Sequence, residues 1–202
     1  GATTPTSESQ DSNIDVETQA KSAHALAGTI MSGAEIIMQV LADEGIRTIF
    51  GYSGGAILPT YDAVFRYNEA HAVDGKEPIP LIVPANEQGA GFMAAGYARA
   101  SGQVGVAIVT SGPGATNCVT PVRDCMADSI PIVLICGQVP TGAIGSDAFQ
   151  ETDVTGVTLP ITKHNMLVMD VKDVAQAIHD AFHIARTGRP GPVLVDIPRD
   201  VL

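Results

Sequence analysis

The sequence of 202 residues has no tryptophan, few aromatic residues and only 11 lysines and arginines against 22 aspartates and glutamates. A formal net charge of −11 leaves no basic surface for nucleic acid, whose phosphates require lysine and arginine. The longest apolar run, Ile130 to Cys136, is far shorter than the roughly 20 residues that cross a bilayer. These absences argue against a nucleic-acid-binding protein and against a membrane protein.

Cysteine is scarce as well. Cys118, Cys125 and Cys136 are an odd number, widely spaced within apolar segments, and they match neither a zinc motif nor a disulfide framework. We therefore expect buried free thiols, a reducing compartment and a cytoplasmic location.

Residues 1–27 are polar and acidic and contain no arginine, which argues against a transit peptide or a secretory signal. We expect a disordered tail there and one domain over residues 28–202.

The remaining sequence is rich in apolar residues, at 45%, and in glycine, with 21 residues. Short apolar runs predict strands near residues 48–50, 81–83, 104–109, 131–136, 161–169 and 192–197. Helical patterns lie between them, near residues 33–44, 57–68, 92–98, 118–127 and 171–187, the first opened by a capping box at Ser32 and Glu35. This alternation predicts an α/β fold, a three-layer doubly wound parallel sheet with helices on both faces.

Glu87 lies where the third helical pattern follows the strand at 81–83. Open α/β sheets bind ligands at the carboxyl ends of their strands. Alanine, glycine, phenylalanine and methionine surround Glu87 in the sequence, and poor solvation raises the pKa of a carboxyl group toward the range useful for proton transfer. The competing interpretation is an ordinary first-turn glutamate favoured by the helix dipole.

Other motifs fit their chemistry poorly. The turn at residues 111–114 lacks the third glycine of a dinucleotide fingerprint, because Asn117 stands there. His179 and His183 lack the glutamate and third ligand of a zinc protease, and Ser53 lacks the spacing of a nucleophile elbow. One acid and several glycine-rich turns at a sheet edge remain, which suits a flat neutral heterocycle.

Several motifs resemble the pyrimidine-binding domain of thiamine-diphosphate enzymes: Gly51-Tyr52-Ser53-Gly54-Gly55-Ala56, Asn86-Glu87-Gln88-Gly89-Ala90, residues 96–100 and residues 110–117. Residues 137–140, 144–153, 161–165 and 188–196 narrow the resemblance to the large subunit of acetolactate synthase (acetohydroxyacid synthase). The resemblance runs from about residue 32 to the end.

The resemblance implies roles for individual residues. Glu87 would be the catalytic residue, hydrogen-bonded to N1′ of the aminopyrimidine ring of the cofactor. The other cofactor-binding positions would be Tyr52, Gly54, Gly55, Pro113, Asn117 and Gln150 for thiamine diphosphate, and Ser129 and Arg189 for a structural FAD. Phe149 and Lys163 would line the substrate channel. The family departs from this sequence at two positions, carrying His where Asn86 stands and Pro where Ser53 stands.

The implied activity is the thiamine-diphosphate-dependent decarboxylative condensation of two pyruvates, or of pyruvate and 2-ketobutyrate, in branched-chain amino acid biosynthesis. The family binds Mg²⁺ and the diphosphate through a Gly-Asp-Gly motif in a later domain, so we expect no metal ligands in this chain. We expect a homodimer or higher oligomer, with a regulatory small subunit as a further partner and the chain inactive by itself. The alternatives are glyoxylate carboligase, sulfoacetaldehyde acetyltransferase, a pyruvate oxidase, or a non-catalytic binding module.

Overall fold

The computed structural model describes residues 24–202, so residues 1–23 of the expected tail lie outside the described part. Two units are distinguished, and in the first the described residues 24–30 form turns. The second unit is Met31–Leu202, which contains every helix and strand described below.

Six parallel strands form one sheet in the order β2-β1-β3-β4-β6-β5. The strands are β1 (Ile49–Tyr52), β2 (Leu81–Ile82), β3 (Gly105–Val109), β4 (Ile132–Gln138), β5 (His164–Leu167) and β6 (Val193–Pro198). The predicted parallel α/β sheet is therefore confirmed.

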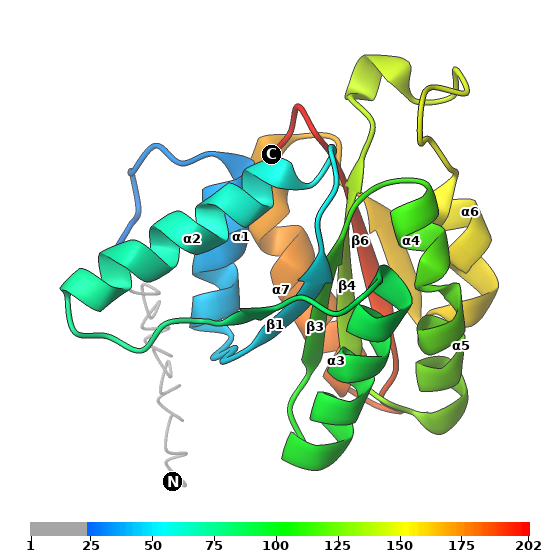
Figure 1. Cartoon of the computed structure of the whole chain (residues 1–202), viewed down its shortest axis with the longest axis horizontal. Helices are drawn as coiled ribbons and strands as arrows, with labels where there is room; N and C mark the ends of the chain where they lie inside the picture. The colour runs from blue at the N-terminus through cyan, green and yellow to red at the C-terminus, as the bar shows by residue number, and fades with distance from the viewer. Residues whose placement is uncertain (1–23) are drawn as a thin grey trace, which may run out of the picture. The chain divides into compact units, whose positions relative to one another are not determined.

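Helices cover both faces of the sheet (Figure 1). One face carries α1 (Gly33–Asp43), α2 (Leu58–Val73) and α7 (Val174–Arg186). The other carries α3 (Glu87–Ser101), α4 (Pro113–Asn117), α5 (Val119–Asp128) and α6 (Val154–Thr158). Parallel crossovers are right-handed, so connections running in opposite directions along the sheet lie on opposite faces. The connections through α2 and α7 run one way, and those through α3, α5 and α6 run the other.

This winding makes β1 and β3 diverge at their carboxyl ends. The chain leaves β1 toward α2 on one face and leaves β3 toward α4 and α5 on the other. A crevice opens outside the sheet where neighbouring connections part in this way, and α/β proteins bind their ligands there.

The central strands are buried on both sides, as their continuous apolar sequences predict. In β3, Val106 and Ile108 pack toward α1, α2 and α7, while Ala107 and Val109 pack toward α3 and α5. Two separate apolar layers hold the helices in place and fix the strand ends.

Several boundaries differ from the sequence-based expectation. Residues 113–117, expected as a loop, form α4, because Gly112 adopts a φ of 50° and Pro113 then occupies the first helical position. Helix α6 was not expected, α2 extends to Val73, beyond the expected helix near residues 57–68, and β5 has four residues rather than nine. The capping box of α1 is confirmed: Ser32 Oγ accepts from the amide of Glu35, and Glu35 Oε2 accepts from the amide of Ser32.

Gly105 provides a test of the contact between β3 and α3. A Cβ at this position would lie 2.2 Å from the backbone oxygen of Ala94, which cannot rotate away. We expect Gly105→Ala to lower the free energy of unfolding by about 2 kcal/mol or more. Gly96, exposed on α3 with nothing within 4 Å of its Cβ position, is the matched control, and Gly96→Ala should leave stability unchanged or raise it by up to about 1 kcal/mol. Urea unfolding of both variants gives the comparison, and equal stabilities would contradict the close approach.

Candidate functional site

Glu87 occupies the first turn of α3, just beyond the carboxyl end of β2. Asn86 precedes it in an extended conformation and caps the helix, its Oδ1 accepting from the amide of Gly89 at 2.9 Å. This cap explains how Asn serves where the family usually carries His, because asparagine is among the preferred N-cap residues. The Glu87 side chain is only 8% exposed.

A single side chain pairs with the Glu87 carboxylate. Asn117, the last residue of α4, donates from Nδ2 to Glu87 Oε2 at 2.8 Å. The thiol of Cys118 lies 3.4 Å from the backbone oxygen of Glu87 and donates to it. No donor within residues 24–202 reaches Oε1, which leaves this oxygen available to a ligand.

Glycines keep the space beside this carboxylate clear. A Cβ on Gly114 would lie 3.4 Å from Glu87 Oε1 and 2.7 Å from the methyl group of Thr110. A Cβ on Gly54 would lie 2.4 Å from the same methyl group. Thr110 is 5% exposed, and its Oγ1 accepts from the amide of Ala56 at 3.3 Å. Thr110 thus joins the loops that follow β1 and β3, and both loops need glycine to meet there.

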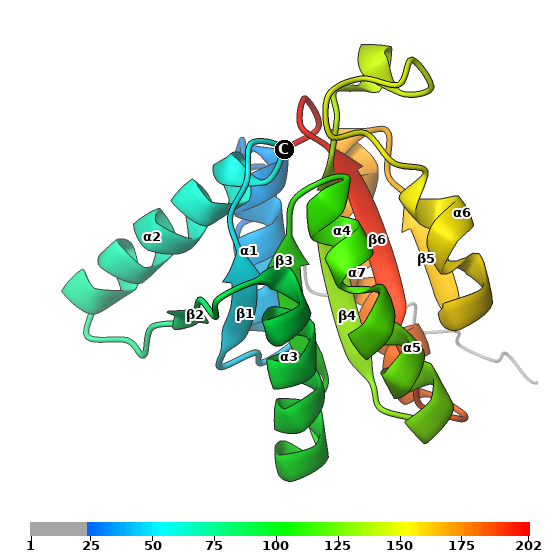
Figure 2. The same ribbon diagram turned by 45° about the vertical axis from the view of Figure 1, so that its right-hand side comes forward.

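The long loop after β4 reaches the same edge. Gly112 packs so closely against Gln150 that a Cβ on Gly112 would lie 2.3 Å from the Gln150 backbone oxygen. The neighbouring Phe149 is 88% exposed, and Tyr52 at the end of β1 is 37% exposed. Figure 2 shows this loop, in yellow-green, rising above the carboxyl ends of the strands. The structure therefore gathers most of the expected cofactor residues at one edge: Tyr52, Gly54, Gly55, Glu87, Pro113, Asn117 and Gln150.

Burial keeps two groups near Glu87 protonated, the Cys118 thiol and the Tyr61 phenol. Burial, with a further contribution from the charge of Glu87, raises the pKa of the Cys118 thiol to about 12. The same two causes raise the pKa of the Tyr61 phenol well above its usual value, and Tyr61 donates its proton to the Ile108 backbone oxygen at 3.2 Å. Neither group therefore adds a negative charge beside Glu87.

Three predicted residues lie at the opposite, amino edge of the sheet. Arg189 donates from Nε to Ser129 Oγ at 2.8 Å and from Nη2 to the backbone oxygens of Met126 and Ala127, each at 3.0 Å. Lys163 donates to the backbone oxygens of Ile184 and Thr187. Both cations cap the carboxyl ends of helices, α5 and α7, and several of their donors are already used within the protein.

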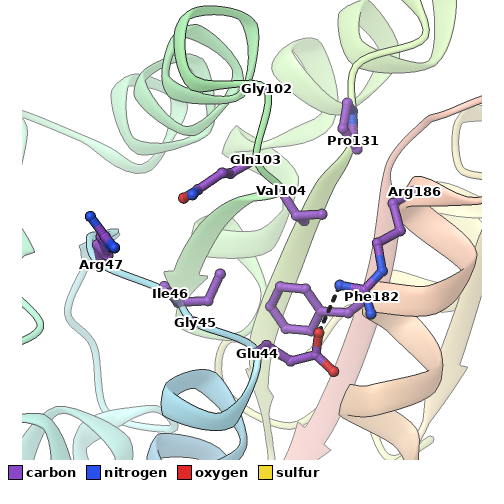
Figure 3. A pocket seen from close by; sticks show the side chains of 10 residues that line it. All are labelled: Glu44, Gly45, Ile46, Arg47, Gly102, Gln103, Val104, Pro131, Phe182 and Arg186. Atoms are coloured by element: carbon purple, nitrogen blue, oxygen red, sulfur yellow. Dashed lines mark hydrogen bonds and ion pairs between the residues drawn. The ribbon is translucent and has the colours of Figure 1, made fainter.

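A pocket of about 440 Å³ also lies at the amino edge (Figure 3). Its charged residues are Glu44, Arg47 and Arg186. The Glu44 carboxylate accepts from His179 Nδ1 at 2.7 Å and from Arg186 Nη1 at 2.8 Å. These contacts tie α1 to α7 and account for His179, which the sequence suggested only weakly as a metal ligand. Because Glu44 is already paired and the pocket lies at the edge opposite Glu87, we assign this pocket no part in the candidate site.

Two residues of the carboxyl edge have no individual role predicted from the sequence. Thr110 directly follows β3 and opens the motif at residues 110–117, and its position between two glycine turns was a usable signal. Arg199 follows β6 directly, and its exposed side chain places a cation at the edge where the strands end.

Within residues 24–202, no group of three or more histidine, cysteine, aspartate or glutamate side chains could hold a metal ion. In the same part of the chain, every helix is too short or too polar to cross a bilayer.

The three cysteines give a simple test of the packing around the site. All are buried and free, as expected from the sequence, and burial raises the pKa of Cys118 and Cys125 to about 12 and that of Cys136 well above its usual value. An aromatic disulfide reagent at about pH 8 should leave all three thiols unmodified in the native chain and titrate them fully in guanidinium. Rapid reaction of one thiol in the native chain would contradict the packing.

Comparisons with known proteins agree with this arrangement. The profile of the family described as thiamine pyrophosphate enzyme, N-terminal TPP binding domain, matches residues 31–157. The mitochondrial acetolactate synthase catalytic subunit of Aspergillus candidus is 54% identical over 170 residues, which cover 84% of this chain and 23% of that protein. The mitochondrial acetolactate synthase catalytic subunit of Saccharomyces cerevisiae is 52% identical over 171 residues, which cover 85% of this chain and 24% of that protein. The acetolactate synthase large subunit of Corynebacterium glutamicum is 48% identical over 184 residues, which cover 91% of this chain and 28% of that protein. The chain thus spans about a quarter of the length of these relatives.

Since the profile matches well over half of the chain, the chain belongs to the family of thiamine pyrophosphate (thiamine diphosphate) enzymes, of which it carries the N-terminal cofactor-binding domain.

Proposed function

We propose that the chain is the pyrimidine-binding part of an acetolactate synthase catalytic subunit, a thiamine-diphosphate-dependent transferase that condenses 2-keto acids. The observation that carries the proposal is the buried Glu87 carboxylate, held at one oxygen by Asn117 and facing a cradle of glycines with the other. The high identity to acetolactate synthases across 84–91% of this chain supports the choice within the family.

The residues present fit the aminopyrimidine ring. The ring is flat and needs a hydrogen bond to one ring nitrogen, and the space kept clear by Gly54 and Gly114 lies beside Glu87 Oε1. When bound, thiamine diphosphate supplies a thiazolium carbon that adds to a 2-keto acid and allows it to lose carbon dioxide. Glu87 would hold or share a proton at N1′, which a buried carboxyl group can do because water does not compete for that proton.

The surrounding residues would orient this proton. Asn117 fixes the carboxylate by its hydrogen bond to Oε2, so that Oε1 is presented to the ligand. Thr110 holds the loops after β1 and β3 together, and Pro113 starts the helix that carries Asn117. Gln150 and the exposed Phe149 would close the site from the loop above, excluding water when the substrate is bound.

Other parts of the proposal reach beyond this chain. The 2-keto acids carry a carboxylate that the exposed Arg199 would attract. The diphosphate and Mg²⁺ would be bound by another domain, across an interface between subunits of a homodimer or higher oligomer. FAD at Ser129 and Arg189, and Lys163 in the substrate channel, remain predictions that the helix-capping contacts of Arg189 and Lys163 do not favour. We propose a cytoplasmic location, with the mitochondrion as the alternative because the names of two fungal relatives include it.

A chimera tests the role of Glu87. Residues 32–202 would replace the matching segment of the Saccharomyces cerevisiae catalytic subunit, and exchange of the thiazolium C2 hydrogen with deuterium would be followed by NMR. We expect Glu87→Gln to slow this exchange by roughly 100-fold or more, because glutamine cannot hand a proton to the ring nitrogen. Glu69→Gln, on the exposed side of α2, is the control and should exchange at the parent rate. Undiminished exchange in Glu87→Gln would refute the proposal.

The 202-residue chain alone should not form acetolactate from pyruvate, even with thiamine diphosphate and Mg²⁺ added, because it offers no group of ligands for the metal within residues 24–202. The chimera should form it under the same conditions. Parallel assays with glyoxylate and sulfoacetaldehyde separate the other carboligase activities. Acetolactate formation by the chain alone would contradict the proposed division of the site.

A further inference from the structure

A second hollow, of about 290 Å³, lies at the carboxyl edge under the loop that follows β4. We call it the Asp196 pocket. Its lining comes from the ends of β4, β5 and β6, from the loop and from the start of α6, and includes Gln138, Ile144, Glu151, Asp153, Leu167 and Asp196. The loop that roofs it is the yellow-green segment at the top of Figure 2. Its volume is near the lower end of the range for small-molecule sites.

Asp196 carries one unsatisfied oxygen. The side chain is 1% exposed, and its Oδ2 accepts from Gln138 Nε2 at 2.9 Å. Its Oδ1 is buried without a hydrogen-bond partner among the described residues. Leaving a buried acceptor unsatisfied is costly, so such an atom in a native protein calls for a donor, either an ordered water or a bound ligand.

The neighbouring side chains cannot supply the missing donor. Gln138 Nε2 also donates to the Thr152 backbone oxygen at 3.1 Å, which uses both of its hydrogens, and Gln138 Oε1 accepts from the amide of Val139. The residues that pair with Asp196 in the sheet register are Cys136 and Leu167, which offer at most a weak thiol donor. Within residues 24–202 no donor reaches Oδ1, and the pocket that Asp196 lines is the space from which one could enter.

The charge of the lining restricts what can enter. Asp153 and Glu151 are both negative and both already serve backbone groups, Asp153 accepting from the amide of Gly156 and Glu151 from the amide of Ala148, each at 2.9 Å. No lysine or arginine of residues 24–202 lines the pocket, and its remaining wall includes the apolar Ile144, Val154 and Leu167. A carboxylate such as a 2-keto acid would be repelled, whereas a cation with a short apolar body matches both charge and lining.

We propose that the Asp196 pocket binds a small organic cation of the alkylammonium class, whose nitrogen donates to Asp196 Oδ1 while its apolar body packs on Ile144, Val154 and Leu167. The site is separate from Glu87, because it is built on β4, β6 and β5 rather than on β1, β2 and β3. The inference does not rest on the proposed enzymatic activity.

The titration of Asp196 supports this geometry. Burial raises the pKa of Asp196 to about 7, against a lowering by the Gln138 hydrogen bond and a further rise from the charge of Asp153. The other titratable groups facing it are Glu151 at the pocket wall and Cys136 on β4, whose thiol stays protonated. A bound ammonium would favour the ionised carboxylate, so affinity should rise as pH increases from about 6 to about 8.

Binding would be measured with isobutylammonium chloride as the probe, on the full 202-residue chain, by NMR at about pH 8. We expect saturable shifts of the Gln138 side-chain amide, which donates to both Asp196 and Thr152. The uncharged isobutanol should bind at least about 10-fold more weakly, and isobutyrate should not bind measurably. Asp196→Asn should weaken isobutylammonium binding by about 10-fold or more, whereas Asp180→Asn, on the exposed side of α7, should leave it unchanged.

Leu167→Trp provides a second variant that keeps the carboxylate. Leu167 lies at the rim of the pocket and is 37% exposed, so a larger side chain there fills the pocket without entering the core. It should abolish isobutylammonium binding while Asp196 remains. Equal binding of isobutanol and isobutylammonium, or no shift of Gln138 up to roughly 50 mM probe, would overturn the proposal.

The pH dependence of the free energy of unfolding tests whether Asp196 Oδ1 is unpaired. In the unfolded chain Asp196 loses its proton near its ordinary pKa of 3.8, whereas the folded chain keeps it up to about 7. Between these values folding retains a proton, so the free energy of unfolding falls as pH rises. Asp196→Asn should remove this part of the pH dependence and raise stability at about pH 8 relative to the parent chain. An unchanged pH dependence would show that Oδ1 is already paired and would remove the basis of the proposal.

Discussion

The hydrogen bond from Asn117 to Glu87 is the contact on which the candidate site depends. It joins the first turn of α3, which follows β2, to the last residue of α4, which follows β3. A carboxylate that is 8% exposed is stable only when something pairs with it, and Asn117 pairs with one oxygen without neutralising the charge. The remaining oxygen has no donor among the described residues, while the dipole of α3 favours negative charge at that end. The pair therefore stabilises the buried Glu87 carboxylate and leaves one of its oxygens available to a ligand.

Close packing of backbones makes that pairing possible. Gly54, Gly112 and Gly114 each stand where a side chain would collide with a neighbour, and the neighbours are Thr110, the Gln150 backbone and Thr110 again. Three loops, from β1, β3 and β4, can therefore meet at one point of the sheet edge only with glycine at these positions. The site is as much a consequence of missing side chains as of the glutamate itself.

The sequence predicted the sheet, its burial and the place of Glu87, because apolar runs and the first turn of a helix are local features. It did not predict contacts between distant segments. Lys163 belongs to the expected strand 161–169, whereas in the structure it lies just before β5, which begins at His164, and its amine donates to the end of α7. Thr110 and Asn117 acquire their roles through partners 54 and 30 residues away. In the sequence, Asp196 is a single acid within an apolar strand. The sequence does not show that its Oδ1 is unpaired, because this depends on which acceptors the side-chain amide of Gln138 binds.

The winding of the chain explains why one edge would carry two sites. The exits of β1 and β3 part to opposite faces, which opens the crevice beside Glu87. The exits of β4 and β6 part as well: β4 continues into the loop and α6 on one face, while β6 ends in a turn whose last residue accepts from the amide of Ala34 in α1 on the other. Asp196 and Gln138 stand on the two strands that diverge there. The rule that predicts a ligand beside Glu87 therefore predicts one beside Asp196. Among the described residues, three carboxylates and no lysine or arginine line the Asp196 pocket, which selects a cation.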